Sequence, residues 1–402
     1  VDKYASNFIR RTCLFPTQIE KIVAWINNNG VICSDLTVDT VNRIIANEDT
    51  PHHVREALIT RQNVSHAAFK KYPAMLAATM PDDTVKGCFA YHAAHTGRFG
   101  GRLIQPHNFT RGSINAIKAV EEIKAGNYSV ELVKSAVRGM VYHPDGFTIA
   151  DYNAIEARTV AWLAGEQDAL DVFINGQDPY RWMAQYIYEV EYDDVTDEQR
   201  FVGKQAVLGL GYQMGHIKFK SQAERFGVEI APDTAIKAVM VYRRTHDKIV
   251  NLWSTLQHAA KMALERPGRR IKANKYISFE RPEASLFLYM HLPSGRRIAY
   301  PYPEIRDASF SHMHVSLGQW KRVDTYGGRL VENAVQAIAR DIMCEALQEM
   351  RHLDVVMHVH DETVTVGDHR SEITGIMEYV PEWAEGLPLK VEAKYAERFY
   401  KA

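Results

Sequence analysis

The chain has 402 residues, of which 46% are hydrophobic and 24% are charged, and its formal net charge is −1 at pH 7. This length exceeds one typical domain, and the balanced charge excludes a surface that is basic overall, so any affinity for nucleic acid must come from local patches. Four scattered cysteines without a CxxC pair exclude a zinc site and a disulfide framework, and no apolar run reaches the length of a membrane span.

Helical patterns dominate the first 90 residues. The segments TQIEKIVAWINNNG (17–30) and DLTVDTVNRIIAN (35–47) have apolar residues at helical spacing. A further helical pattern, INAIKAVEEIKAGN (114–127), follows the arginine-rich segment HTGRFGGRLIQPHNFTR (95–111). We therefore expect a helical N-terminal region, with another helical stretch between residues 113 and 133.

The stretch from Phe147 to Glu166 predicts a strand, a carboxylate and a helix in succession. A short apolar run ends on Asp151, and an amphipathic pattern begins almost at once. An aspartate in this place can hold a divalent cation, although such junctions are often only helix caps.

The segment RFVGKQAVLGLGYQMG, from Arg200 to Gly215, predicts a helix with four notable positions on one stripe. These positions are Arg200, Lys204, Leu208 and Tyr212. They recur every four residues, so on an α-helix they share a face about 120° wide and about 18 Å long. Arg200 and Lys204 can bind a triphosphate. The alternative interpretation is a solvated Arg/Lys pair followed by core residues. Glycine costs about 1 kcal/mol inside a helix, so the four glycines indicate close packing or a bend.

Strand patterns return in the second half of the chain. Residues 271–302 alternate as strands do, with LPSGR as a hairpin turn, and VVMHVHDETVTVG (355–367) predicts a hairpin with Asp361 and Glu362 near its turn. A polar turn is the simpler interpretation of the latter. However, two aspartates that converge from separate strands can hold two Mg²⁺ ions about 4 Å apart, as in-line phosphoryl transfer requires.

In this order, the motifs resemble those of the family A DNA polymerases, the family of bacterial DNA polymerase I and its phage members. DYNAIEAR is similar to motif A, RFVGKQAVLGLGYQMG to motif B and HVHDETV to motif C. HTGRFGGRLIQPHNFTR resembles segments that contact primer and template, and NAVQAIARDI (333–342) resembles the Gln-bearing palm helix that precedes motif C. The matches span roughly residues 60–402, and five motifs in sequence are far more specific than one.

The resemblance implies a complete set of site residues. Catalytic roles fall on Asp151, Lys204, Asp361 and Glu362, and metal-binding roles fall on Asp151, Asp361 and Tyr152, the last through its carbonyl. Nucleotide-binding roles fall on Glu156, Tyr180, Arg200, Lys204, Leu208 and Tyr212. DNA-binding roles fall on Arg98, Asn108, Arg111, Gln336 and His360. Glu156 would lie beneath the incoming sugar and exclude a 2′-hydroxyl, and the cofactor would be two Mg²⁺ ions, with Mn²⁺ as a substitute.

Three positions depart from the family's pattern. Leu208 stands where the family usually has a Phe or Tyr that packs on the sugar. Tyr180 stands where a phosphate-binding His is often found, and a phenol carries no positive charge at neutral pH. The spacing from Asn333 to Gln336 is one residue shorter than usual, so a role is assigned only to Gln336, and Glu332 is not mapped.

The fold implied by the resemblance is an α+β right-hand polymerase fold, with an antiparallel-sheet palm, helical fingers and a helical thumb. The expected thumb covers residues 1–90, and the first part of the palm, with motif A, covers 91–165. The fingers, with motif B and a β-rich insertion, cover 166–319. The second part of the palm, with motif C, covers 320–402. The stretch 113–133 has no assigned role.

The function that we expect is template-directed addition of deoxynucleotides to a primer 3′ end by two-metal-ion phosphoryl transfer. Primer-template DNA and dNTPs are the expected partners, and an upstream exonuclease domain or other replication proteins are further candidates. No carboxylate cluster in residues 1–90 resembles the DxE site of a 3′→5′ exonuclease. In the absence of a signal peptide or membrane span, we expect a cytoplasmic location in a bacterium or a phage-infected host cell.

Two other functions compete with this one. A single-subunit RNA polymerase also uses two aspartates and an Arg/Lys/Tyr helix, but Glu156 and the HDE triplet favour the DNA enzyme. A non-catalytic DNA-binding homologue would have lost the metal carboxylates, whereas Asp151 and Asp361 are both present.

Overall fold

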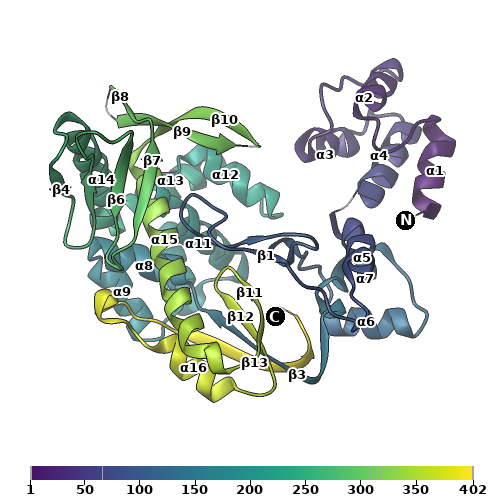
Figure 1. Cartoon of the computed structure of the whole chain (residues 1–402). Coiled ribbons are helices and arrows are strands. Elements are labelled where there is room, and N and C mark those ends of the chain that lie inside the picture. The colour runs from purple at the N-terminus through teal and green to yellow at the C-terminus, as the bar shows by residue number, and fades with distance from the viewer. Residues whose placement is uncertain (1, 66, 308, 317, 401–402) are drawn as a thin grey trace. The chain divides into compact units, whose positions relative to one another are not determined.

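The computed structural model forms two compact units, which are described separately here (Figure 1). The structure describes residues 2–65, 67–307, 309–316 and 318–400. Unit 1 comprises Val1–Ala90, Gly101–Phe147 and Ala396–Ala402, and unit 2 comprises Tyr91–Gly100 and Thr148–Tyr395.

Unit 1 is mainly helical. Its helices are α1 (Asp2–Thr12), α2 (Ile19–Asn28), α3 (Val38–Ala46), α4 (His52–Ser65), α5 (Ala67–Ala78), α6 (Ala116–Lys124) and α7 (Val130–Ser135), with the 3₁₀ turns η1 (Pro106–Asn108) and η2 (Arg138–Met140). Helices α2 and α3 confirm the two predicted N-terminal helices, and α6 and α7 confirm the helical pattern between residues 113 and 133. The apolar stripes of α1 to α4 form one core, which includes Phe8, Ile22, Ile26, Val41 and Leu58.

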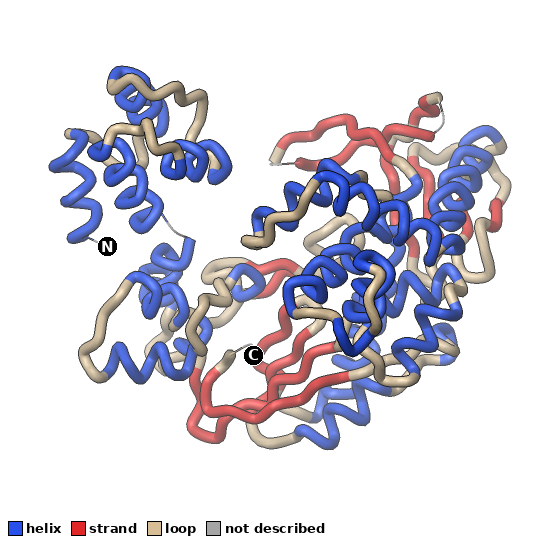
Figure 2. The backbone as a smooth tube through the Cα atoms, turned by 180° about the vertical axis from the view of Figure 1, so that it is seen from behind, coloured by secondary structure: helices blue, strands red, loops and turns tan. Residues whose placement is uncertain are grey.

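The sheet that carries the predicted carboxylates has four strands in the order β11-β12-β3-β13. The strands of the chain are red in Figure 2. Its strands are β3 (Tyr142–Tyr152), β11 (Val355–Val359), β12 (Glu362–Val366) and β13 (Val391–Arg398). The buried run from Phe147 to Ala150 makes β3 a central strand. Strands β11 and β12 pair antiparallel as a hairpin, as the sequence predicts.

Helices make up most of the rest of unit 2. They are α8 (Ile155–Ala164), α9 (Gln167–Ile174), α10 (Pro179–Tyr188), α11 (Asp197–Gly209), α12 (His216–Arg225), α13 (Pro232–Thr245), α14 (Asp247–Glu265), α15 (Gly327–Glu349) and α16 (Arg370–Glu378), with the 3₁₀ turns η3 (Tyr192–Asp194), η4 (Leu210–Tyr212), η5 (Met350–His352) and η6 (Glu382–Ala384). One core packs α8, α14 and α15 together, and a second packs α10, α11, α12 and α13 together. The helices that carry site residues are thus fixed by two separate cores.

Two smaller antiparallel sheets complete unit 2. Their strands are β4 (Arg270–Lys272), β5 (Ser278–Glu280), β6 (Phe287–His291) and β7 (Arg297–Pro301) in one sheet, and β8 (Glu304–Arg306), β9 (Ser309–Ser316) and β10 (Gln319–Thr325) in the other. Strands β6 and β7 pair antiparallel around LPSGR, so the predicted hairpin is confirmed. The very short strands β1 (Phe89–Ala90) and β2 (Gly100–Gly101) lie at the borders of the units in the sequence.

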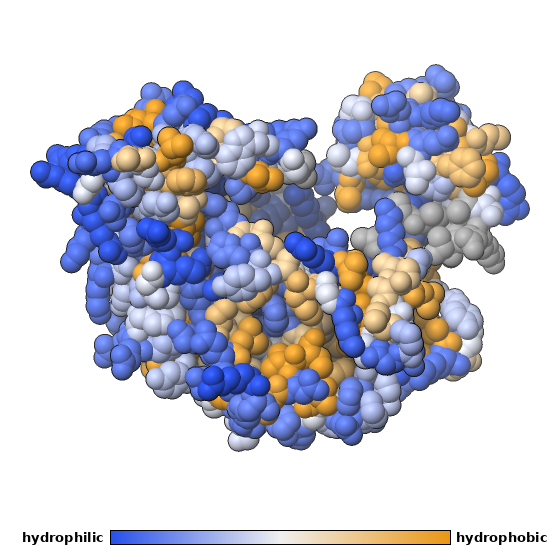
Figure 3. All heavy atoms as spheres, viewed as in Figure 1, coloured by the Kyte–Doolittle hydropathy of each residue, from blue (hydrophilic) through white to orange (hydrophobic). Residues whose placement is uncertain are grey.

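The surface agrees with the balanced composition. Hydrophilic residues are interspersed with smaller hydrophobic patches on the face seen in Figure 3, rather than giving way to one continuous apolar surface. Among the described residues, no helix has both the length and the apolar character needed to cross a membrane.

Candidate functional site

The first part of the site lies where β3 meets α8. Residues Phe147 to Ala150 are buried, Asp151 is partly exposed, and the Tyr152 side chain is buried. Ala154 has a left-handed φ of +51°, which turns the chain from the strand into α8. The predicted order of strand, carboxylate and helix is confirmed, with Asp151 one residue before the end of the strand.

The second part of the site is the turn between β11 and β12. This turn contains His360, which has a left-handed φ of +57°, and Asp361. The backbone N–H of Tyr152 donates to the backbone carbonyl of Asp361 at 3.0 Å. Because Tyr152 directly follows Asp151, this hydrogen bond brings the segments that carry the two aspartates side by side.

Glu362 is placed differently from its neighbour Asp361. It begins β12 opposite Val359, and its side chain is 1% exposed, whereas Asp361 is partly exposed. The Glu362 carboxylate is therefore enclosed by the protein, whereas Asp361 lies in the turn and is in part accessible to solvent. This arrangement favours Asp361 over Glu362 as an ion ligand.

Helix α11 carries the predicted cations, but it is shorter than expected. The prediction of one α-helix from Arg200 through Tyr212 is wrong in its last turn, because α11 ends at Gly209 and Tyr212 lies on the 3₁₀ turn η4. The helix changes from α to the tighter 3₁₀ form where Gly211 packs closely against Tyr242. A Cβ on residue 211 would lie 3.0 Å from the Tyr242 hydroxyl. The glycines of this segment therefore mark both close packing and a change of helix type.

Arg200 and Lys204 face helix α10. The Nε of Arg200 donates to Oδ2 of Asp178 at 2.6 Å. The Arg200 guanidinium and the Lys204 ammonium lie 5.3 Å and 5.7 Å from the centroid of the Tyr180 ring. Gly203 permits this approach, since a Cβ there would come within 2.1 Å of the Tyr180 carbonyl oxygen. Three predicted nucleotide-binding residues are thus brought together.

Asp178 is a member of this cluster that the sequence did not reveal. Its Oδ1 accepts from the backbone N–H groups of Tyr180 at 2.8 Å and Arg181 at 3.3 Å, and so caps α10. The Asp-Pro pair in the sequence is typical of a helix start, but it carries no information about a contact with Arg200. Burial, reinforced by Asp178, raises the pKa of Tyr180, so its phenol stays neutral.

Glu156, in the first turn of α8, is held by two other predicted residues. Nη2 of Arg98 donates to its Oε1 at 2.5 Å, and the Tyr212 hydroxyl donates to its Oε2 at 3.3 Å. Burial, followed by the charge of Glu156, raises the pKa of Tyr212 well above its usual value. Tyr212 is therefore a protonated donor at neutral pH, and Glu156 accepts its hydrogen bond.

Gln336 connects α15 to the same region. Its Nε2 donates to Oε1 of Glu332 at 3.2 Å, and the Thr96 hydroxyl donates to its Oε1 at 3.5 Å. Burial raises the pKa of Glu332. Neither Thr96 nor Glu332 was predicted to belong to the site, although Glu332 precedes Gln336 by one helical turn.

A small pocket in unit 2 is lined by residues of the Arg98 segment, α8, α15 and the β11–β12 turn. Its lining includes Arg98, Ile155, His360 and Asp361. Predicted DNA-binding residues therefore lie at the same pocket as one of the predicted metal ligands.

Three predicted site residues remain. Leu208 is 36% exposed on α11. Asn108 and Arg111 belong to unit 1, where Nδ2 of Asn108 donates to Oε1 of Gln105 at 3.1 Å. Both are exposed there.

The chain belongs to DNA polymerase family A, because residues 43–401 match the profile of that family. The resemblance that the motifs carry is thereby confirmed. The "DNA polymerase" of Bacillus phage SP02 is 32% identical over 417 aligned positions, which cover 96% of this chain and 63% of the phage protein. The "DNA polymerase I" of Aquifex aeolicus is 25% identical over 131 positions, which cover 30% of this chain and 23% of that protein.

The fold is also similar to that of a solved polymerase. The POL domain of Pol1 from M. smegmatis, in complex with DNA primer-template and dNTP, has a TM-score of 0.69 at 16% sequence identity. The match covers 99% of this chain and 64% of the other chain. The predicted α+β right-hand polymerase fold is confirmed. The chain spans about two thirds of the length of this structure, and 63% of the phage relative.

Proposed function

We propose that the chain is a template-directed DNA polymerase that adds deoxynucleotides to a primer 3′ end by two-metal-ion phosphoryl transfer. The observation that carries this proposal is the hydrogen bond from Tyr152 N–H to the Asp361 carbonyl, 3.0 Å long. It joins the strand of Asp151 to the turn of Asp361, so the segments that carry two carboxylates from distant parts of the sequence lie side by side.

The oxygen donors at this place fit divalent cations. Asp151, Asp361 and the Tyr152 carbonyl are hard oxygen ligands, which Mg²⁺ and Mn²⁺ prefer. Among the described residues, no group of three or more His, Cys, Asp or Glu side chains can hold an ion by itself. That accords with Mg²⁺, which typically binds through one or two carboxylates together with water and substrate phosphates. When bound, two such ions lower the pKa of a hydroxyl nucleophile and neutralise charge on the phosphates.

The chain's own residues provide the grip on the nucleotide. Arg200 and Lys204 offer two cations beside one aromatic ring, that of Tyr180, and a triphosphate is the ligand that this cluster suits. Asp178 occupies the Nε of Arg200, which leaves the other guanidinium nitrogens to donate to phosphate oxygens. Tyr180 supplies a neutral hydrogen-bond donor where a cationic histidine often stands in the family.

Sugar selection falls to Glu156. Its carboxylate is held by Arg98 and Tyr212, so it can fill the space beneath the sugar without rotating away. A fixed side chain at this position excludes a 2′-hydroxyl by its volume. This supports the DNA enzyme over the single-subunit RNA polymerase.

The wider assignments belong to the same proposal. Residues 1–90 would act as the thumb and 166–319 as the fingers, while 91–165 and 320–402 would form the palm. Primer-template DNA and dNTPs would be the substrates, and similarity to a phage polymerase supports a place in the cytoplasm of a host cell. An upstream exonuclease domain or other replication proteins remain candidate partners.

Primer extension tests the proposal. We expect a purified preparation to extend a labelled primer on a DNA template with Mg²⁺ and dNTPs, to stop when Mg²⁺ is chelated, and to use ribonucleotides poorly. Efficient extension with ribonucleotides would favour the RNA polymerase. DNA binding without extension under both Mg²⁺ and Mn²⁺ would favour the non-catalytic homologue.

The same preparation tests for exonuclease activity. Residues 1–90 contain no DxE sequence, so this chain should not trim a 3′-labelled single strand. The Asp151→Ala/Asp361→Ala double variant is the cleanest sample, because it removes the proposed polymerase carboxylates. Mg²⁺-dependent degradation by that variant would contradict this part of the proposal.

A further inference from the structure

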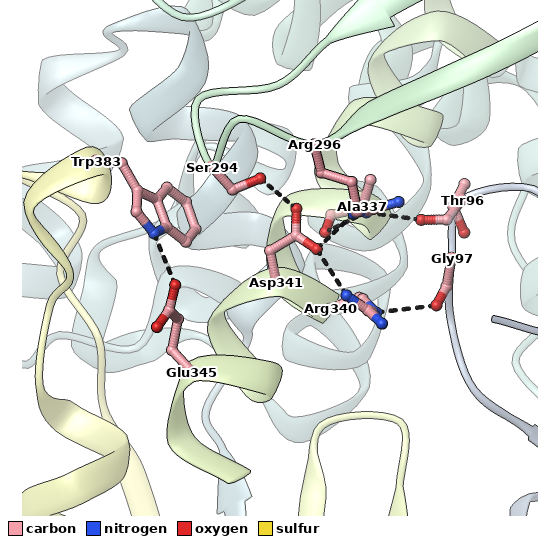
Figure 4. Close-up of polar contacts among 9 residues, drawn as sticks. All are labelled: Thr96, Gly97, Ser294, Arg296, Ala337, Arg340, Asp341, Glu345 and Trp383. Atoms are coloured by element: carbon pink, nitrogen blue, oxygen red, sulfur yellow. Dashed lines mark hydrogen bonds and ion pairs between the residues drawn. The ribbon is translucent and has the colours of Figure 1, made fainter. Parts of the chain in front are cut away.

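Asp341 lies in α15 with its side chain surrounded by polar groups (Figure 4). The residue is 5% exposed. Ser294 Oγ donates to its Oδ2 at 2.6 Å, and Arg296 Nε donates to its Oδ1 at 2.7 Å. Nη1 of Arg340 donates to the same Oδ1 at 3.2 Å. Since Ser294 and Arg296 come from the turn between β6 and β7, one carboxylate joins that turn to α15.

The same two arginines hold the loop of residues 91–100, which we call the Arg98 loop. Nη2 of Arg296 donates to the Thr96 carbonyl at 2.9 Å, and Nε of Arg340 donates to the Gly97 carbonyl at 3.0 Å. These are the two carbonyl groups immediately before Arg98 in the chain. Figure 4 shows both hydrogen bonds reaching the loop from the side of Asp341.

Close packing reinforces this hold. Gly97 has φ of +87°, and a Cβ there would lie 2.5 Å from Nη1 of Arg296, so the loop fits the guanidinium only with glycine at this position. The Arg340 guanidinium lies 5.2 Å from the ring centroids of both Tyr91 and Phe99. One arginine thus contacts the loop near its beginning, its middle and its end.

The Asp341 carboxylate compensates the charges of two arginines that are largely buried. The side chains of Arg340 and Asp341 are 7% and 6% exposed, and that of Arg296 is 20% exposed. Removing one partner of a buried ion pair leaves the other charge uncompensated, which costs far more than an exposed pair contributes. Without Asp341, the two guanidinium groups would repel each other and would lose the carboxylate that they share.

We propose that Asp341 is a positioning residue for Arg98, acting through Arg296 and Arg340 on the backbone of the Arg98 loop. Arg98 in turn binds Glu156 at 2.5 Å, so the position of the loop affects the contact between these two site residues. This inference rests on the proposed polymerase function, in which Arg98 contacts the primer end.

A double-mutant cycle tests the proposal in the whole chain. Asp341→Asn should lower kcat for primer extension about tenfold and change KM for dNTP less than about twofold, because the variant disturbs Arg98 rather than the cations on α11. In an Arg98→Ala background, the same substitution should lower kcat less than about twofold, since the residue being positioned is already gone. Equal losses in both backgrounds would show a merely structural role and overturn the proposal.

Glu345→Gln is the matched control. Glu345 is a carboxylate on the same helix, one turn further on, and its Oε1 accepts from Trp383 Nε1 at 3.2 Å, away from the Arg98 loop (Figure 4). This variant should extend primers within about twofold of the wild type, with no dependence on Arg98. Thermal unfolding identifies a temperature at which all variants are folded, and the kinetics are compared there.

Hydrogen exchange gives a readout that does not require activity. Deuterium uptake by peptides that cover residues 91–100 should be about tenfold faster in Asp341→Asn than in the wild type, and unchanged in Glu345→Gln. Unchanged uptake in Asp341→Asn would overturn the proposal even if extension falls. If the wild-type chain does not extend primers at all, the proposed function fails, and the exchange experiment alone decides whether Asp341 holds the loop.

Discussion

The carboxylate region and the cationic region of unit 2 are built in different ways. In the carboxylate region, the main chain places the functional residues: β11 pairs with β12, and Tyr152 N–H binds the Asp361 carbonyl at 3.0 Å. In the cationic region, side chains place one another: Asp178 binds Arg200 at 2.6 Å, and both cations contact the ring of Tyr180.

The difference bears on two of the three departures from the family's pattern that are expected from the sequence. Main-chain hydrogen bonds form with almost any side chain, so the position of Asp361 does not depend on the identity of its neighbours. Side-chain contacts depend on the residues that make them. Tyr180 and Leu208, two of the departures from the family's pattern, both belong to the cationic region.

The largest loss of primer-extension activity is expected for a substitution in the carboxylate region. Asp151→Ala should slow primer extension by more than about a hundredfold, on the order of 3 kcal/mol in barrier, because it removes a ligand for the proposed ions. Affinity for primer-template should stay within a few-fold, since DNA affinity arises from many phosphate contacts. Asp193→Ala, at an exposed aspartate in η3, is the control and should extend normally. Extension by Asp151→Ala at more than about a hundredth of the wild-type rate would contradict the assignment.

Glu156→Ala tests the junction of the two regions. Loss of the side chain opens the space beneath the sugar, so the ratio of kcat/KM for dNTP over rNTP should fall by about tenfold or more. Some activity should also be lost, because Arg98 and Tyr212 lose their common acceptor. The measurement is single-nucleotide incorporation with matched dNTP and rNTP. An unchanged ratio would place discrimination elsewhere.

Leu208→Tyr probes the cationic region with a smaller expected effect. Leucine has no hydroxyl to replace a missing 3′-OH, so the wild type should discriminate strongly against dideoxynucleotides. Tyrosine at this exposed position should reduce the ratio of kcat/KM for dTTP over ddTTP about fivefold, roughly 1 kcal/mol. Fold should be unaffected, since the helix tolerates either side chain. Equal use of both nucleotides by the wild type, or an unchanged ratio in the variant, would mean that Leu208 does not contact the sugar.

The smallest effect concerns acid stability. Burial lowers the pKa of His246 to about 4, and its ring stacks on Tyr242 with centroids 4.2 Å apart. The folded state holds this histidine neutral, whereas the unfolded state binds a proton below about pH 6.5. Stability is therefore full above that pH and falls as pH drops from about 6.5 towards 4.

His246→Gln should separate this effect from packing. The variant should have a lower Tm than the wild type at pH 7.5. Between pH 7.5 and pH 5, however, its Tm should decrease by about 2 °C less than that of the wild type. His358 on β11, whose pKa burial also lowers to about 4, is the counterpart in the carboxylate region, and His358→Gln should behave in the same way. Parallel Tm curves for wild type and His246→Gln would contradict the linkage.

The sequence predicted the carboxylate region well because its signals are local. A buried strand, an aspartate and an amphipathic helix follow one another within twenty residues, and a β-branched hairpin surrounds HDE. Tyr212 was misplaced because the end of a helix depends on packing, here of Gly211 against Tyr242. Nothing in the sequence around Gly211 indicates that Tyr242 packs against it.

Contacts between residues far apart in the sequence were also not predicted, because they depend on packing in the folded chain. The Asp178 carboxylate reaches Arg200 across 22 positions, and Asp341 reaches Arg296 across 45. In the sequence alone, Asp178 is explained as a helix cap and Asp341 as part of a helix. Only the folded chain brings their charges together.

The central claim is that the carboxylates serve the chemical step, whereas the cations of α11 bind the nucleotide. The most direct test is a rapid-quench titration of dNTP with Asp361→Ala and Arg200→Ala. Asp361→Ala should reduce the maximal incorporation rate by more than about a hundredfold and leave the apparent Kd for dNTP within about threefold. Arg200→Ala should raise that Kd by about tenfold or more, which is the loss expected for a charge-assisted contact with phosphate. A normal maximal rate for Asp361→Ala, or an unchanged Kd for Arg200→Ala, would contradict the account.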